Sequence, residues 1–215
     1  MRSYTAAGVA IALATLAGWG TLSPESSARG AGACLRLPEA RVIYNTDEAV
    51  VVRSRPRRAY YGCLKRQGRA IRIGSPDRVF DVHPIAGPYV AAQSSAGIKK
   101  FPGSTAGRIW LTLTDLRSGV EYRVFKSFTY DDGEGGINSI TLRETGSIAF
   151  QTTGGRKDKI HLYACELATC YDSRRYGARL RDLDESQSGF INIRLDGDTL
   201  RWTGDNNQEK SALLR

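Results

Sequence analysis

The chain has 215 residues, a formal net charge of +9 at pH 7 and 41% hydrophobic residues. This length suits one domain with a substantial core and is short for two domains. The chain contains two histidines, four cysteines and no Cys-x-x-Cys pair, which is not the spacing of a zinc site. We therefore expect neither a metal nor a cofactor.

Residues 1–28 read as a secretory signal peptide. Arg2 precedes an uncharged run over residues 3–22, and small-x-small cleavage sites end at Ala28 and Ala33. Cleavage after Ala28 is preferred because that site lies closer to the apolar run. The less favoured alternatives are lipidation of Cys34 and an uncut membrane anchor. No later apolar stretch has spanning length, so the sequence predicts a secreted or cell-surface protein with no transmembrane segment after signal removal.

All four cysteines follow this leader, and an oxidising destination turns an even count into an expected disulfide framework. Three pairings exist. Cys165 and Cys170 flank "ELAT", a length suited to a hairpin turn, so these two side chains are expected to meet across it. That pairing leaves Cys34 to bond with Cys63.

Two segments of the chain follow one plan. In residues 139–155 and again in residues 192–207, apolar residues alternate, a glycine follows, and the alternation resumes. Alternation with a period of two predicts strands with one buried face. The two glycines, Gly146 and Gly197, are 51 residues apart, and a looser copy places Gly87 at the corresponding turn.

A second hairpin is expected after each of these first hairpins. Its turn positions are Gly68, Gly119 and Cys170, again at intervals of 51 residues. Two independent markers therefore give the same period. A period near fifty with four strands per unit is typical of propeller blades.

The sequence therefore predicts one all-β domain over residues 42–215, built from antiparallel four-stranded units repeated about four times. The expected architecture is a small or incomplete β-propeller, and the alternative is a β-sandwich, in which similar hairpins also recur. The last unit, residues 186–215, has room for three strands. The N-terminal segment at residues 29–41, continuing to Tyr44, is the natural donor of a ring-closing strand, and the alternatives to a closed ring are an open arc and a paired assembly.

Three motifs carry a family resemblance: "DLRSG" at Asp115–Gly119, "GSIAF" at Gly146–Phe150 and "LRWTGDNN" at Leu200–Asn207. They resemble the degenerate propeller-like repeats, TolB-type and WD40-type in style, of uncharacterised secreted bacterial proteins. The strict Gly-His and Trp-Asp pairs of WD40 blades are absent. The resemblance implies strands and turns and assigns no site residue.

Few residues suggest catalysis. His161 lies in the alternating segment "KIHLYA", and His83 precedes Pro84. Neither histidine has a nucleophile marked for activation near it. The alternative function, an extracellular hydrolase or lyase, would depend on His161 with an acidic loop that contains Asp131, Asp132 and Glu134. Aspartates beside glycines are also ordinary turn residues, so no catalytic residue is assigned.

Charge gives the clearest functional indication. Residues 53–72 contain eight basic side chains and no acidic one, with two tyrosines between them. Guanidinium groups and aromatic faces together suit a polymer bearing phosphate or carboxylate. The candidate binding residues are Arg53, Arg55, Arg57, Arg58, Tyr60, Tyr61, Lys65, Arg66, Arg69 and Arg72.

These observations favour a secreted, non-catalytic binding or scaffold module over an enzyme. Its expected partner is an anionic envelope polymer or a protein. The competing interpretation is that arginine merely supplies the polar face of solvent-exposed strands.

Overall fold

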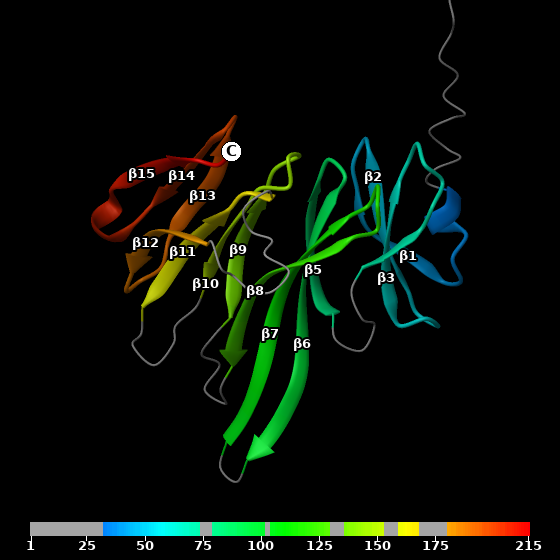
Figure 1. The fold of residues 1–215 in the computed structure, drawn as a ribbon, viewed down its shortest axis with the longest axis horizontal. Coiled ribbons are helices and arrows are strands. Elements are labelled where there is room, and N and C mark those ends of the chain that lie inside the picture. Colours follow the sequence, from blue (N-terminus) through cyan, green and yellow to red (C-terminus); the bar gives the residue numbers. More distant parts are fainter. Residues whose placement is uncertain (1–31, 74–78, 102–103, 130–135, 153–158, 168–179) are drawn as a thin grey trace, which may run out of the picture.

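A computed structural model describes residues 32–73, 79–101, 104–129, 136–152, 159–167 and 180–215. Nearly all regular structure in these segments is β-strand, arranged as four antiparallel sheets (Figure 1). Each sheet is a simple meander of consecutive strands. The predicted all-β fold with about four repeated units is confirmed.

The first sheet consists of β1 (Ala40–Asn45), β2 (Ala49–Ser54), β3 (Ala59–Leu64) and β4 (Ile71–Ile73). The second consists of β5 (Val79–Ala86), β6 (Tyr89–Phe101), β7 (Ser104–Asp115) and β8 (Glu121–Thr129). The third consists of β9 (Ile137–Leu142), β10 (Ile148–Thr152), β11 (Ile160–Cys165) and β12 (Arg181–Ser186). The last consists of β13 (Ile191–Asp196), β14 (Thr199–Thr203) and β15 (Glu209–Leu213), with the 3₁₀ turn η1 (Asp205–Asn207) before β15.

Glycines with positive φ lie at corresponding turns of these sheets, as the sequence predicts. Gly87, Gly146 and Gly197 connect the first two strands of the second, third and last sheets, with φ of 53°, 85° and 56°. Gly68 and Gly119 connect the last two strands of the first and second sheets. Only glycine adopts these angles without steric cost. Cys170, the third predicted marker of this turn, lies outside the described residues.

A β-bulge is a further repeated feature. The first strand of every sheet carries at least one extra residue relative to the strand it pairs with, and β5 carries two, the second of them between Val79 and Asp81. The other bulges lie between Val42 and Tyr44, Val82 and Ile85, Asn138 and Thr141, and Ile191 and Arg194. Bulges bend a strand and redirect its side chains.

The sheets stack face to face in chain order (Figure 1). Val51 and Ile73 of the first sheet pack against Val90 and Leu116 of the second. The other two interfaces are built in the same way. Between the second and third sheets, the buried residues are Tyr89, Leu111, Leu113 and Val124 on one side and Ile148 and Phe150 on the other. Between the third and last sheets, they are Leu162 and Ala164 on one side and Leu200, Trp202 and Leu214 on the other.

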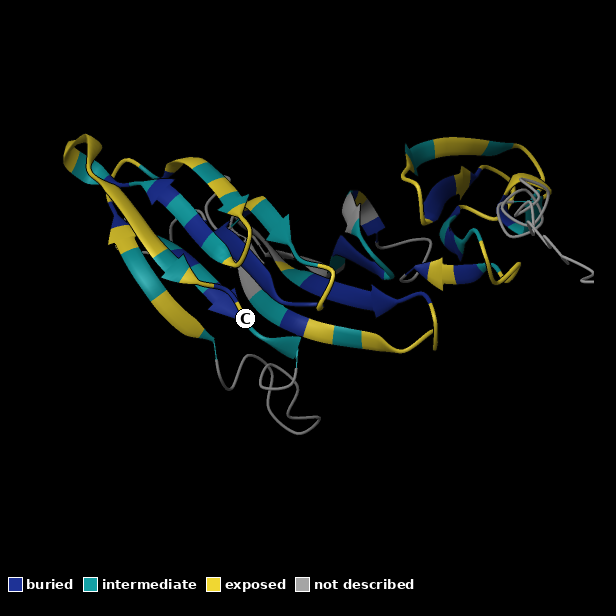
Figure 2. Cartoon of the chain, turned by 90° about the horizontal axis from the view of Figure 1, so that it is seen from above, coloured by how far each residue is buried: buried dark blue, intermediate teal, exposed yellow. Residues whose placement is uncertain are grey.

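The two middle sheets therefore bury both of their faces, and the sequence reflects this burial. All five residues of β10, "IAFQT", are buried. A strand covered on both sides favours a continuous apolar run, which Ile148–Phe150 supply here, whereas a half-exposed strand alternates. Figure 2 shows the buried residues concentrated in the interior of the stack and the exposed ones on its outer strands.

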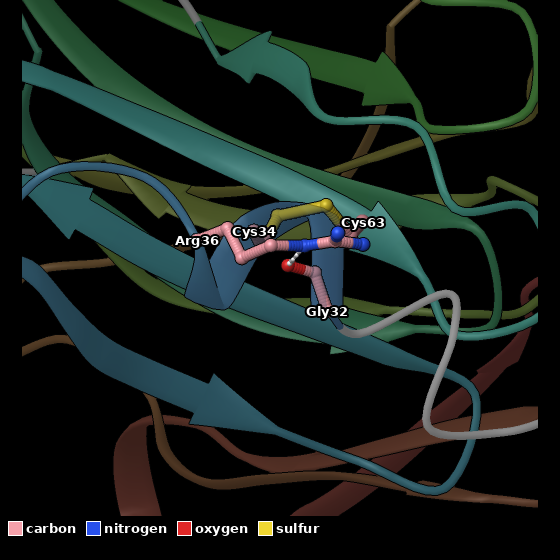
Figure 3. Close-up of a disulfide and its surroundings, with 4 residues drawn as sticks. All are labelled: Gly32, Cys34, Arg36 and Cys63. Carbon is pink, nitrogen blue, oxygen red and sulfur yellow. Dashed lines mark hydrogen bonds between the residues drawn. A yellow bond between two sulfur atoms is a disulfide. The ribbon is translucent and has the colours of Figure 1, made fainter. Parts of the chain in front are cut away.

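A short N-terminal segment covers the outer face of the first sheet. Cys34 and Leu37 pack on Val50 and Val52, and a disulfide joins Cys34 to Cys63 in β3 (Figure 3). The Ser54 hydroxyl donates a hydrogen bond to the Pro38 carbonyl at 2.8 Å. The predicted Cys34–Cys63 pairing is confirmed. Cys165 is also disulfide-bonded, and its predicted partner, Cys170, lies outside the described residues.

The outer face of the last sheet is mostly polar, with Ile191 and Leu213 as its exposed apolar residues. Arg194 forms an ion pair with Glu209 at 2.9 Å, and Arg201 forms one with Asp196 at 3.2 Å. A polar terminal face is the usual way in which a stack of repeats ends. The two ends of the stack are therefore covered differently, one by the disulfide-linked segment and the other by charge.

The ring-closing role predicted for the N-terminal segment is wrong. β1 pairs with β2 in the first sheet, at the end of the row opposite to the last sheet (Figure 1). The segment from Cys34 to Tyr44 therefore does not complete the last sheet, because the disulfide fixes Cys34 to β3. Within the described residues the four sheets form an open stack.

No helix in the described part of the chain has both the length and the apolar character required to cross a membrane.

Candidate functional site

Most of the predicted basic residues lie at one end of the first sheet. Arg53 is on β2, residues 55–58 form the turn between β2 and β3, and Tyr60 and Tyr61 begin β3. β4 brings Arg72 opposite Tyr61. We call this group the arginine end, and it consists of Arg41, Arg53, Arg55, Arg57, Arg58, Tyr60, Tyr61 and Arg72.

Three predicted residues lie elsewhere. β3 has six residues, so roughly 20 Å separates the turn at 55–58 from Lys65, Arg66 and Arg69. This second group lies beside the β1–β2 turn, where the Lys65 amide donates a hydrogen bond to the Glu48 carbonyl at 2.8 Å. The structure therefore divides the continuous basic stretch of the sequence between opposite ends of one sheet.

Two arginines of this end are held over tyrosine rings. The guanidinium carbon of Arg53 lies 5.7 Å from the ring centroid of Tyr60, and that of Arg57 lies 5.9 Å from the centroid of Tyr61. Because neighbouring strand residues alternate in direction, Tyr60 and Tyr61 lie on opposite faces of the sheet. Cation–π contact orients each guanidinium and leaves its N–H groups available to an anion.

Arg41 is a site residue that the sequence stretch did not include. It lies on β1, directly opposite Arg53. Like charges in such a position repel each other. The signal in the sequence was its position five residues before the first hairpin turn, which begins at Thr46, but the pairing register is required to bring it opposite Arg53.

No ion pair among the described residues neutralises the positive charge of this end. Among the described residues, none of its six arginines forms an ion pair with a carboxylate. The last sheet differs, because Arg194 and Arg201 both have acidic partners there. An uncompensated cluster of this kind produces a local positive potential that attracts anions.

The structure describes only some of the residues considered for catalysis. His161 Nδ1 lies 3.0 Å from Asp182 Oδ2 on the neighbouring strand, and its ring stacks on Tyr163 with centroids 5.5 Å apart. This pairing gives His161 a structural role on the β11–β12 ladder. The acidic loop with Asp131, Asp132 and Glu134 lies outside the described residues.

A groove of 660 Å³ lies where the first hairpin turns of the four sheets meet. Asp47, Glu48 and Glu144 are among its lining residues. Arg143 also lines it, but its guanidinium is bound to Asp198 and to the Leu214 carbonyl. The described part of the chain contains no group of three or more histidine, cysteine or acidic residues arranged to hold a metal ion.

A smaller pocket of 420 Å³ contains His83, which sequence reasoning did not assign to a site. Burial lowers the pKa of His83, and the nearby negative charge of Asp81 opposes that effect. The imidazole is therefore neutral at pH 7.

Searches among protein-family models, curated proteins and solved structures found no match to this chain.

Proposed function

We propose that the protein is a non-catalytic, extracytoplasmic binding module whose arginine end contacts an anionic polymer. The observation that carries this proposal is the group of six arginines without a carboxylate partner among the described residues. A folded protein gains nothing in stability from such a group, because its members repel one another.

The arrangement of the cations favours a polymer over a small anion. Arg53 with Tyr60 lies on one face of the sheet, Arg57 with Tyr61 lies on the other, and the turn at 55–58 connects them. A single phosphate or carboxylate would contact only part of this surface. An extended chain with repeated negative charges can contact both faces and the turn between them.

Location outside the cytoplasm rests on the expected signal peptide and on the disulfide chemistry. Bonds such as Cys34–Cys63 persist in oxidising compartments and are rare in the cytosol. The polymer is then envelope material or an acidic glycan rather than nucleic acid.

We also infer that the four sheets are degenerate blades of the propeller type in an open arrangement. The strand order is the same in each sheet, and β9 contacts both β5 and β13, as the inner strands of neighbouring blades would. A solution scattering profile of an elongated, open particle would agree with this inference, whereas a ring-shaped profile would contradict it.

The binding proposal is tested with two matched charge variants. Arg55→Ser/Arg57→Ser/Arg58→Asn removes three charges from the arginine end, and Lys65→Ser/Arg66→Ser/Arg69→Ser removes three from the opposite end. Fluorescence anisotropy would measure the affinity for labelled heparin and polygalacturonate between 50 and 500 mM NaCl. Over this range the screening of charge by salt rises from roughly weak to strong.

We expect the first variant to weaken binding by about tenfold or more, because each surface ionic contact contributes up to about 1 kcal/mol. The second variant should change the affinity by less than about threefold. Equal losses in both variants would show that only net charge matters. Binding that does not weaken as salt rises would exclude the ionic contact altogether.

A further inference from the structure

The pocket around His83 lies between the second and third sheets. Its volume of 420 Å³ is within the range that accommodates small ligands, roughly 300–1,000 Å³. Asp81 and His83 come from β5, Gln93 from β6, and Asn138 and Ser139 from β9, above an apolar wall that includes Ile137. Three strands of two different sheets therefore supply its polar groups.

A chain of hydrogen bonds fixes the orientation of two of these groups. Gln93, which is 5% exposed, donates from Nε2 to the Ile137 carbonyl at 2.8 Å. The same nitrogen lies 2.9 Å from His83 Nε2. The Ile137 carbonyl oxygen can only accept a hydrogen bond, so the side-chain atom of Gln93 that faces it must be the amide nitrogen. His83 Nε2 must then accept, so its proton resides on Nδ1.

This chain leaves a defined set of polar groups unused. The Nδ1–H of His83 is a donor, and the carboxamide oxygen of Gln93 is an acceptor. The Asp81 carboxylate lies 3.6 Å from His83 Nε2, beyond hydrogen-bond distance, and the side chains of Asn138 and Ser139 make no hydrogen bond to another described residue. The pocket thus offers both donors and acceptors in fixed positions.

Two β-bulges produce this arrangement. The bulge between Val82 and Ile85 contains His83, and the bulge between Asn138 and Thr141 contains Ser139, whose φ is 50°. Positive φ in a residue other than glycine is strained and is often found at functional sites. The corresponding bulges of the first and last sheets do not line this pocket.

The charge of the pocket restricts its ligand. Among the described residues that line it, Asp81 is the only one with a formal charge, and no lysine or arginine contributes. An anion would meet the Asp81 carboxylate without a cation to balance it. A divalent cation would find a single carboxylate, which is too few ligands for a stable site.

We propose that this pocket binds an uncharged, hydroxyl-rich ring, such as one sugar unit of a neutral glycan. Sugar hydroxyls both donate and accept hydrogen bonds, which matches Asp81, His83, Asn138 and Ser139, and the C–H face of the ring can lie against Ile109 and Ile137. This site is separate from the arginine end and does not depend on the function proposed for that end.

The test uses maltotriose, cellotriose and triacetylchitotriose as probes with the full mature chain. Isothermal titration calorimetry gives the affinity, and amide chemical shifts of Asn138 and Ser139 locate the binding. We expect saturable binding of at least one probe, with an affinity that is unchanged between 50 and 500 mM NaCl, a range of roughly weak to strong screening of charge. His83→Ala and Asn138→Ala should each weaken it about three- to tenfold through loss of a hydrogen bond.

The matched control is Asn192→Ala, because Asn192 occupies the bulge of the last sheet with φ of 55° and lies outside the pocket. It should leave the affinity unchanged, as should the triple arginine variant. Should His83→Ala fail to fold, the exposed Asn138 still provides the test. The proposal is overturned if no probe saturates, if both pocket variants bind as the parent does, or if glucuronate binds there instead with salt dependence.

Discussion

Leu116 occupies the space that a side chain at position 62 would fill. A Cβ atom added to Gly62 in β3 would lie 2.4 Å from Leu116 Cδ2 and 3.3 Å from Ile73 Cδ1. Leu116 follows β7 at the turn of the second sheet, and its amide donates a hydrogen bond to the Pro88 carbonyl at 2.8 Å. The second sheet thus inserts one buried leucine into a recess of the first.

Gly62→Ala should therefore destabilise the protein by about 1–3 kcal/mol through overpacking at this recess. The free energy of unfolding, measured by urea denaturation, checks the value. The double variant Gly62→Ala/Leu116→Ala should be less destabilised than the sum of the two single variants. Alanine at position 116 is smaller than leucine and leaves room for the new methyl group at position 62. Additive effects in this double-mutant cycle would contradict the packing explanation.

The disulfide is expected to contribute strongly to stability. Cys34 and Cys63 are 29 residues apart, and closing a loop of that length corresponds to about 3.5 kcal/mol in the chain-entropy treatment. Cys34→Ala/Cys63→Ala should lower the free energy of unfolding by about that amount. It should also release the covering segment from Val50 and Val52, which amide hydrogen exchange would detect as faster exchange in β2. Unchanged exchange there would show that packing alone holds the segment.

The stability of the protein should fall in mildly acidic solution because of His83. Burial lowers its folded-state pKa below the ordinary 6.5, so the unfolded chain binds a proton before the folded chain does. Stability is thus unaffected by this group above pH 6.5 and decreases as the pH falls through the interval below it. Melting temperatures at a series of pH values check this.

His83→Gln is the control for this pH dependence, since glutamine does not titrate. The fall in melting temperature between pH 6.5 and the folded-state pKa should be smaller in the variant than in the parent. An identical fall in both proteins would assign the effect to other groups.

Asp205 should stabilise the connection between the third and last sheets. Its carboxylate accepts hydrogen bonds from the Ser186 and Ser188 hydroxyls and from the Gln187 amide, which lower its pKa from 3.8 to about 2. Because the folded-state pKa is depressed, this contribution is present above pH 3.8 and is lost as the pH falls towards 2.

Asp205→Asn should lower the melting temperature at neutral pH, and the difference from the parent should shrink as the pH approaches 2. Asp196→Asn is the comparison, because this exposed carboxylate has one partner, Arg201, on its own sheet. A difference between parent and Asp205→Asn that is constant with pH would rule out ionisation as its cause.

The repeat was predictable because its markers are local. Each turn glycine follows an alternating run, and the period of 51 residues links Gly68 with Gly119 and Gly146 with Gly197. The three-stranded last sheet was likewise expected from the length that remains after Ser186. Such signals depend only on backbone geometry and burial within a short segment.

The remaining features depend on contacts between distant residues. A ring-closing role was wrongly expected of the N-terminal segment because the apolar residues of β1 suit either the first or the last sheet, although the predicted Cys34–Cys63 bond already tied this segment to the first sheet. The sequence of residues 53–72 gave no indication that β3 places its basic residues at opposite ends of the first sheet. The His83 pocket needs the bulges of β5 and β9 to bring Asp81, Gln93 and Asn138 together, and the alternation of apolar residues does not show which residue of a strand is the extra one.

The unlike ends of the stack limit how such an architecture can grow. A unit inserted between two existing sheets would meet an apolar face on each side. A unit added outside the last sheet would have to remove the Arg194–Glu209 and Arg201–Asp196 pairs from water, which is costly without new partners. Lengthening by gene duplication is therefore favoured in the middle of the array, and end-to-end polymerisation of folded copies is opposed by the ion pairs of the last sheet.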